Sequence, residues 1–128
     1  MRPVGANHRR DILIVDDDPD IRDALSECLR YEGYDVHAAA DGRDALDRLE
    51  FGLKPDVILL DLMMPVLNGF EVLLALRTRP EWRTIPVVVV SANRGYQAED
   101  LQGAVGILRK PVNVDRLISV VEQAATHH

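Results

Sequence analysis

Acidic, hydroxyl and basic side chains stand where apolar runs of the sequence end. Asp16 and Asp17 follow the first such run, Asp61 another, Ser91 the next and Lys110 the last. If these runs are parallel strands, their carboxyl ends share one edge of a sheet, where open α/β sheets bind ligands. Three carboxylates, a hydroxyl and an ammonium would meet there. Such a set could hold a divalent cation and a phosphoryl group.

Apolar runs alternate with segments of helical period along the chain, which indicates an α/β fold. The run 86–90 lacks in/out alternation, as do strands covered on both faces of a parallel sheet. The runs predict strands at about 11–16, 34–38, 56–61, 86–91 and 105–109. The helical segments are predicted at about 19–32, 42–52, 66–78, 97–103 and 112–125.

Residues that favour helix ends support these boundaries. Asp18 and Asp41 are expected to cap the first two helices, with Pro19 at the first helical position. Gly33 is expected to stop the first helix, and Pro111 to open the last.

Length and composition indicate one globular domain of 128 residues. A net charge of −6 argues against direct nucleic-acid binding. The single cysteine, Cys28, excludes an internal disulfide and suits a cytoplasmic protein. Neither a secretory signal nor a run long enough for membrane insertion is found. Residues 1–10 and 126–128 are expected to be disordered tails around a domain at 11–125.

The adjacent carboxylates of Asp16 and Asp17 raise the cost of ionising each other, and a bound cation removes that cost. Mg²⁺ prefers oxygen ligands of this kind. An acidic turn that caps a helix is an equally ordinary explanation of the triplet with Asp18.

Asp61 ends a nearly pure apolar run, where its carboxylate could attack phosphorus to form an aspartyl-phosphate. Ser91 could donate to a phosphoryl oxygen, and Lys110 could neutralise one. Each also has a structural explanation, as a loop cap, a turn residue and a solvated charge. Their shared order and placement favour a site.

Taken together, these motifs resemble the CheY-like receiver domain of two-component response regulators, over about residues 11–125. That resemblance implies a doubly wound (βα)5 flavodoxin-like three-layer sandwich with a five-stranded parallel sheet of strand order 2-1-3-4-5. The segments that carry it are 12–18, 55–65, 68–69, 86–92 and 110–111.

The resemblance also implies roles for the acidic residues. Asp61 matches the phosphoacceptor. Asp17 matches the direct Mg²⁺ ligand, with Asp16 acting largely through water and Met63 giving its backbone carbonyl. The implied cofactor is therefore Mg²⁺.

Ser91 and Lys110 would contact phosphoryl oxygens, with the Lys110–Pro111 peptide cis. The phosphoryl group would come from a sensor histidine kinase or phosphotransfer protein, and an unknown downstream protein, or a second copy in a homodimer, would be bound. The chain would be a signalling switch that catalyses only its own phosphorylation and dephosphorylation.

Two departures from the family fall near the last strand. Ile107 stands where receivers commonly carry Tyr or Phe. The stretch from Ser91 to Lys110 is short by about one helical turn and contains three glycines. We therefore expect the helix at 97–103 to be short or irregular and the output face to be unusual.

Met63 and Asn93 are expected to flank the path of the water that attacks the phosphorylated Asp61. Because Met63 is apolar and cannot orient that water, slow dephosphorylation is expected. A phosphatase that acts on small molecules is disfavoured, because it would need a second carboxylate two residues after Asp61, where Met63 stands.

The main alternative is a pseudo-receiver, an interaction module that works without phosphorylation. Dinucleotide binding is disfavoured because no glycine-rich turn follows the first strand. Outside the site, Trp82 is expected to pack on the surface of a loop, and Arg77, Arg79 and Arg83 to be solvated.

Overall fold

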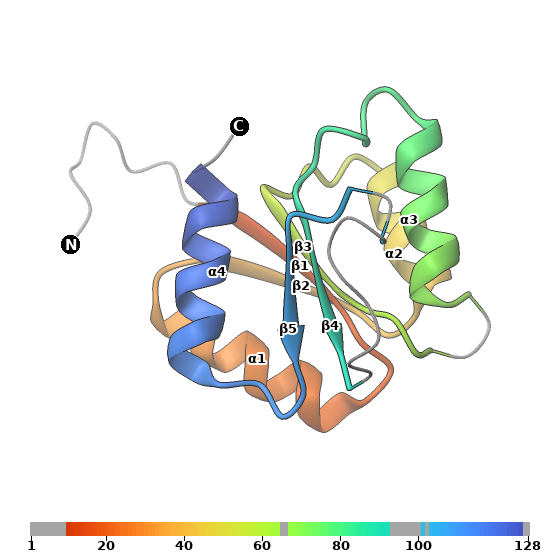
Figure 1. The fold of residues 1–128 in the computed structure, drawn as a ribbon. Helices are drawn as coiled ribbons and strands as arrows, with labels where there is room; N and C mark the ends of the chain where they lie inside the picture. The colour runs from red at the N-terminus through yellow and green to blue at the C-terminus, as the bar shows by residue number, and fades with distance from the viewer. Residues whose placement is uncertain (1–9, 65–66, 93–100, 102, 127–128) are drawn as a thin grey trace, which may run out of the picture.

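A computed structural model describes residues 10–64, 67–92, 101 and 103–126. Strands and helices alternate along it (Figure 1). The strands are β1 (Asp11–Val15), β2 (Asp35–Ala39), β3 (Val57–Asp61), β4 (Val87–Ser91) and β5 (Gly106–Arg109). The helices are α1 (Pro19–Tyr31), α2 (Gly42–Glu50), α3 (Gly69–Thr78) and α4 (Val114–Thr126).

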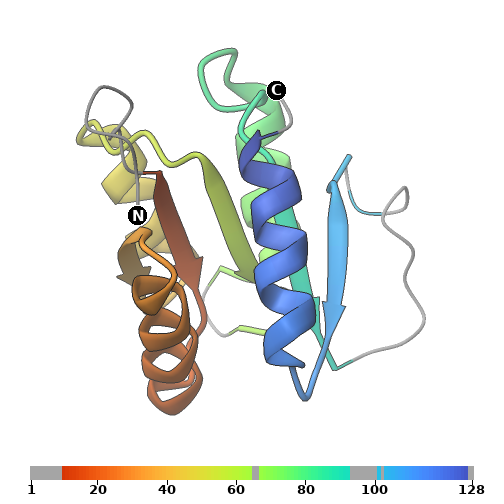
Figure 2. The ribbon, with the colours of Figure 1, turned by 90° about the vertical axis from the view of Figure 1, so that its left-hand side faces the viewer.

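The strands form one parallel sheet in the order β2-β1-β3-β4-β5. Helices α1 and α4 cover one face, in front of the sheet in Figure 2, and α2 and α3 cover the other. The three-layer architecture and strand order expected from the sequence are thus confirmed. β2 and β5 are the edge strands, and β3 lies at the centre.

Two apolar cores, one on each face, explain why the central strands read as continuous apolar runs. Along β1, Leu13 and Val15 belong to the core under α2 and α3. Ile12 and Ile14 belong to the core under α1 and α4. Successive residues of a strand point to opposite faces, so a strand covered on both sides is apolar throughout.

The helices begin where side chains cap them. Asp18 accepts from the Asp20 N–H, and Asp41 accepts from the Asp44 N–H, as predicted. α3 starts at a reciprocal cap between Asn68 and Glu71 rather than at 66.

The predicted opening of the last helix at Pro111 is wrong. α4 begins at Val114 because the Asn113 side chain accepts from the Arg116 N–H, 3.0 Å away. This bond satisfies a free N–H of the first turn, which a proline cannot do.

Trp82 is not a surface residue, in contrast to the prediction. It is 7% exposed and belongs to the core under α2 and α3. The Arg79 guanidinium lies 4.0 Å from its ring centroid and pairs with Glu50 and Glu81, so Arg79 is not simply solvated.

Several expectations fall outside the described residues. These are most of the helix at 97–103, the position of Asn93, and both tails apart from Arg10 and Thr126. Within the part of the chain that the structure describes, no helix is long and apolar enough to cross a membrane.

Candidate functional site

The sheet brings the predicted site residues to one edge. Asp61 and Ser91 are the last residues of β3 and β4, which are neighbours in the sheet. Asp16 directly follows β1, and Lys110 directly follows β5. Because all strands run in the same direction, these four positions lie at their common carboxyl end.

Three carboxylates form the centre of this edge. Oxygen atoms of Asp16, Asp17 and Asp61 all lie within 4.8 Å of one another. Asp16 is 2% exposed and Asp61 is 3% exposed, whereas Asp17 is exposed. The cluster therefore has a buried floor and opens to solvent at Asp17.

Asp16 is held through all of its oxygen atoms. Its Oδ1 accepts from the Asp18 N–H at 2.9 Å, and its Oδ2 lies 3.4 Å from Lys110 Nζ. Its backbone carbonyl accepts from Nη1 of Arg22 at 2.8 Å. Sequence reasoning missed Arg22, because a contact from a helix back to the loop before it has no periodic signal. These bonds fix Asp16 in place and leave Asp17 as the freer ligand.

Asp61 has two partners of its own. Its Oδ1 accepts from the Met63 N–H at 3.2 Å, and its Oδ2 lies 3.6 Å from Lys110 Nζ. Burial raises the pKa of Asp61 to about 6, and repulsion from Asp16 and Asp17 adds to the rise. The Lys110 charge and the Met63 N–H oppose it without cancelling it.

The donor set fits a hard divalent cation. Lys110 brings one positive charge against three carboxylates, so the cluster keeps an excess of negative charge that raises the pKa of Asp61. Oxygen ligands and an opening to water are what Mg²⁺ requires, since it retains several waters when bound. The expected cluster is thus present in the folded chain.

Ser91 and Lys110 lie as the sequence predicted. Ser91 is 1% exposed, and its backbone carbonyl accepts from the Lys110 N–H at 3.0 Å. That bond joins the ends of β4 and β5. The Lys110–Pro111 peptide is cis, as expected. The Met63 side chain is 65% exposed beside the cluster.

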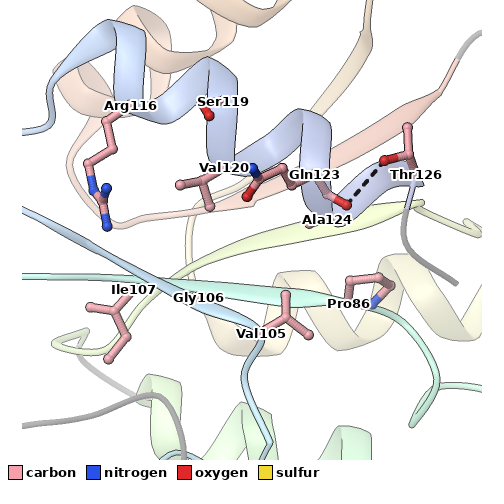
Figure 3. Close-up of a pocket in the computed structure, with 10 residues that line it drawn as sticks. All are labelled: Pro86, Val105, Gly106, Ile107, Arg116, Ser119, Val120, Gln123, Ala124 and Thr126. Atoms are coloured by element: carbon pink, nitrogen blue, oxygen red, sulfur yellow. Dashed lines mark hydrogen bonds between the residues drawn. The ribbon is translucent and has the colours of Figure 1, made fainter.

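Ile107 lies away from this edge, on β5. It contributes to an open groove of about 700 Å³ between β5 and α4, drawn in Figure 3. α4 gives this groove a mostly polar wall that includes Arg116, Ser119 and Gln123. The Ile107 side chain itself points away from α4 in Figure 3 and packs, partly buried, against the core under α2 and α3.

Comparison with known proteins decides the family. The model of the response regulator receiver domain matches residues 12–122. The chain belongs to this family. Receiver domains are signalling switches, and the carboxylate cluster of this receiver lies at the acidic pocket where the family binds Mg²⁺.

Relatives of this receiver include longer regulators. It is 40% identical over 114 residues to the DNA-binding dual master transcriptional regulator RpaA of Synechocystis, covering 86% of this chain and 46% of RpaA. It is 39% identical over 118 residues to a 14.6 kDa protein of Leptolyngbya boryana, covering 88% of each chain. The receiver thus spans about half the length of RpaA and most of the smaller protein.

Solved structures confirm the fold. The Vibrio cholerae chemotaxis protein CheY4 aligns with a TM-score of 0.84 and 32% identity, over 91% of this chain and 99% of CheY4. The Thermotoga maritima response regulator TrrA, in complex with Mg²⁺ and BeF, aligns with a TM-score of 0.80 and 32% identity. That alignment covers 90% of this chain and 98% of TrrA.

Proposed function

We propose that this receiver takes a phosphoryl group from a phosphohistidine of a sensor histidine kinase or phosphotransfer protein onto Asp61. The phosphorylated form would then bind a downstream protein differently, in the cytoplasm. The supporting observation is the placement of Asp61, which is buried, linked to Lys110 and surrounded by Asp16 and Asp17 at the edge of the sheet.

Asp16, Asp17, Asp61 and the Met63 carbonyl would hold Mg²⁺. When bound, Mg²⁺ supplies positive charge that offsets the carboxylates and the phosphoryl oxygens. Asp17 is the direct ligand in this proposal because it is exposed. The carboxylate oxygens of Asp16 already accept from the Asp18 N–H and pair with Lys110, which suits a role through water.

The transfer itself asks mainly for positioning and charge from the chain. A carboxylate oxygen of Asp61 attacks phosphorus, and the bond from phosphorus to the imidazole nitrogen of the donor breaks. The imidazole leaves with that electron pair and takes a proton from solvent. Lys110, already near Asp61 Oδ2, faces the charge that develops on the phosphoryl oxygens.

The product places new negative charge beside Lys110 and Ser91. Both would turn toward it, and their backbones are joined by a hydrogen bond across β4 and β5. A change at Asp61 could therefore reach the surface around β5 and bias a two-state element there.

A phosphorylation-independent interaction module is the second candidate. Ile107 favours it, because a branched aliphatic side chain, packed against the core under α2 and α3, stands where the family commonly places an aromatic ring. The chemistry at Asp61 separates the two candidates.

The test is to incubate the protein with Mg²⁺ and acetyl phosphate and to measure intact mass. We expect one added phosphoryl group, lost in Asp61→Asn and without Mg²⁺. Asp47→Asn, a change at an exposed aspartate on α2, should still be phosphorylated. No added mass in folded protein that binds Mg²⁺ would favour the interaction module.

A further inference from the structure

A second groove lies at the end of the domain opposite the carboxylate cluster. It has a volume of about 430 Å³ and is bordered by the end of α2, the loop before β3 and the loop before β4. Its apolar lining comes from five side chains, Leu49, Leu53, Pro55, Trp82 and Ile85. The groove is thus a preformed apolar recess, large enough to accept an aromatic ring.

One wall of this groove is polar and fixed. Arg79 stacks on Trp82, donates to Glu81 Oε2 from Nη2 at 2.9 Å and also pairs with Glu50. One guanidinium is shared by two carboxylates, so the wall keeps one excess negative charge.

Phe51 projects beside the groove. It directly follows α2 as the C-cap residue and is 91% exposed. Gly52 follows with φ of +109°, a left-handed conformation that turns the chain sharply into the groove-lining loop. The turn leaves a large apolar ring in water next to an apolar recess that it does not fill itself.

Lys54 completes the patch. It lines the groove and is exposed, and no acidic side chain pairs with it among the described residues. This patch, made of Phe51, Lys54 and the groove, therefore offers two complementary pairs. Phe51 supplies a ring and the groove a recess, while Lys54 supplies a free cation and the wall with Glu50 and Glu81 an excess negative charge. A surface that carries both halves of each pair is complementary to a copy of itself related by a twofold axis.

We propose that two copies of this chain associate through this patch. Phe51 of each copy enters the groove of the other, and Lys54 of each copy faces Glu50 and Glu81 of the other. A second copy fits better than an unrelated partner because one patch supplies every complementary feature. The proposal does not rest on phosphorylation, since the patch lies at the far end of the strands from Asp61.

Sedimentation velocity over roughly 10 µM to 1 mM protein tests this association, in the range of weak complexes. Trp82 is the only tryptophan and lines the groove, so its fluorescence reports entry of a ring. We expect Phe51→Ser to raise the dissociation constant at least tenfold and to abolish the change in Trp82 emission. Lys54→Glu should weaken association while leaving the apolar contacts in place.

Tyr31→Ser is the matched control, because Tyr31 is an aromatic residue at the end of another helix and is 89% exposed. It should leave association unchanged, as should Mg²⁺ and acetyl phosphate. Wild-type protein that stays monomeric at 1 mM would overturn the proposal. Equal weakening by Phe51→Ser and Tyr31→Ser would overturn it too, as would amide shifts on self-association confined to the groove beside β5.

Discussion

Among single residues, Asp61 shows the conflict between a reactive carboxylate and a stable fold. Its pKa is raised from 3.8 to about 6, chiefly by burial. The folded state therefore binds the proton more tightly than the unfolded state does. This tighter proton binding adds to the free energy of unfolding. The gain is complete below about pH 3.8 and is lost as pH rises through about 6.

Asp61→Asn should therefore stabilise the metal-free protein at neutral pH, by about 1–2 kcal/mol after allowance for solvent screening. The gain over wild type should grow from pH 4 to 6 and level off above about pH 7. Urea denaturation in the presence of a chelator measures it. Asp47→Asn, at an exposed site, should show no such trend. A less stable Asp61→Asn protein at pH 7 would contradict the prediction.

Met63 sets a second expectation, for the lifetime of the phosphorylated state. Its side chain is exposed beside Asp61 but has no group that can orient a water molecule. Met63→Asn adds an amide there and should shorten the phosphoryl half-life several-fold, followed by intact mass after the donor is removed. Leu74→Asn, an exposed change on α3, serves as the control. A half-life in Met63→Asn that equals or exceeds the wild-type value would refute this role.

At the level of elements, α3 is positioned by direct backbone contact with the end of β3. A Cβ atom added to Gly69 would lie 2.6 Å from the Asp61 carbonyl oxygen and 2.6 Å from Leu62 Cα. Neither backbone atom can move without moving the phosphoacceptor strand. The first residue of α3 is thus part of what holds Asp61 in place.

Gly69→Ala should cost about 1–3 kcal/mol of unfolding free energy through overpacking. It should also slow phosphorylation of the protein that remains folded, because relief of the clash displaces Asp61. Gly106→Ala is the matched control, since its nearest contact would be a Val120 methyl at 3.3 Å, which can shift slightly. Thermal melts and phosphorylation rates that are the same for both variants would show that the contact at Gly69 is unimportant.

The elements also show how far the sequence alone could lead. Each predicted strand lies within one residue of its observed bounds. For the inner strands β1, β3 and β4, the reason is that burial on both faces requires an apolar run that ends where the strand leaves the cores. Strand ends then place Asp61 and Ser91. The start of α4 was missed because Asn113 and Pro111 both suit a helix opening, and only the cap geometry separates them.

Contacts made by long side chains were beyond prediction for a different reason. The bond from Arg22 to the Asp16 carbonyl and the stack of Arg79 on Trp82 depend on loop geometry, which apolar periodicity does not encode. Trp82 in particular follows a helix in a polar segment, yet the loop folds back and buries it. Sequence patterns thus predict where the strand-end side chains lie better than they predict the contacts at the opposite end of the domain.

For the whole molecule, parallel strand direction separates the two proposed activities. The carboxylates meet at the carboxyl ends of the strands, and the Phe51 groove lies at the amino ends. Neither surface shares a residue with the other. Self-association and phosphorylation can therefore be removed one at a time by Phe51→Ser and Asp61→Asn.

The carboxylate cluster exists only in the folded chain, because Asp16 and Asp61 are 45 residues apart in sequence and lie at the ends of β1 and β3, which are adjacent in the sheet. A cation bound there must therefore stabilise the entire domain. At a free Mg²⁺ concentration about a hundredfold above the dissociation constant, the free energy of unfolding should rise by about 2.7 kcal/mol.

Asp17→Asn should lose most of this gain and still fold, because Asp17 is exposed. Thermal melts with and without Mg²⁺ measure this stabilisation in the wild type and in Asp17→Asn. NaCl at matched ionic strength is the control for screening. If NaCl raises the melting temperature as much as Mg²⁺ does, the net charge of −6 explains the effect without a metal site.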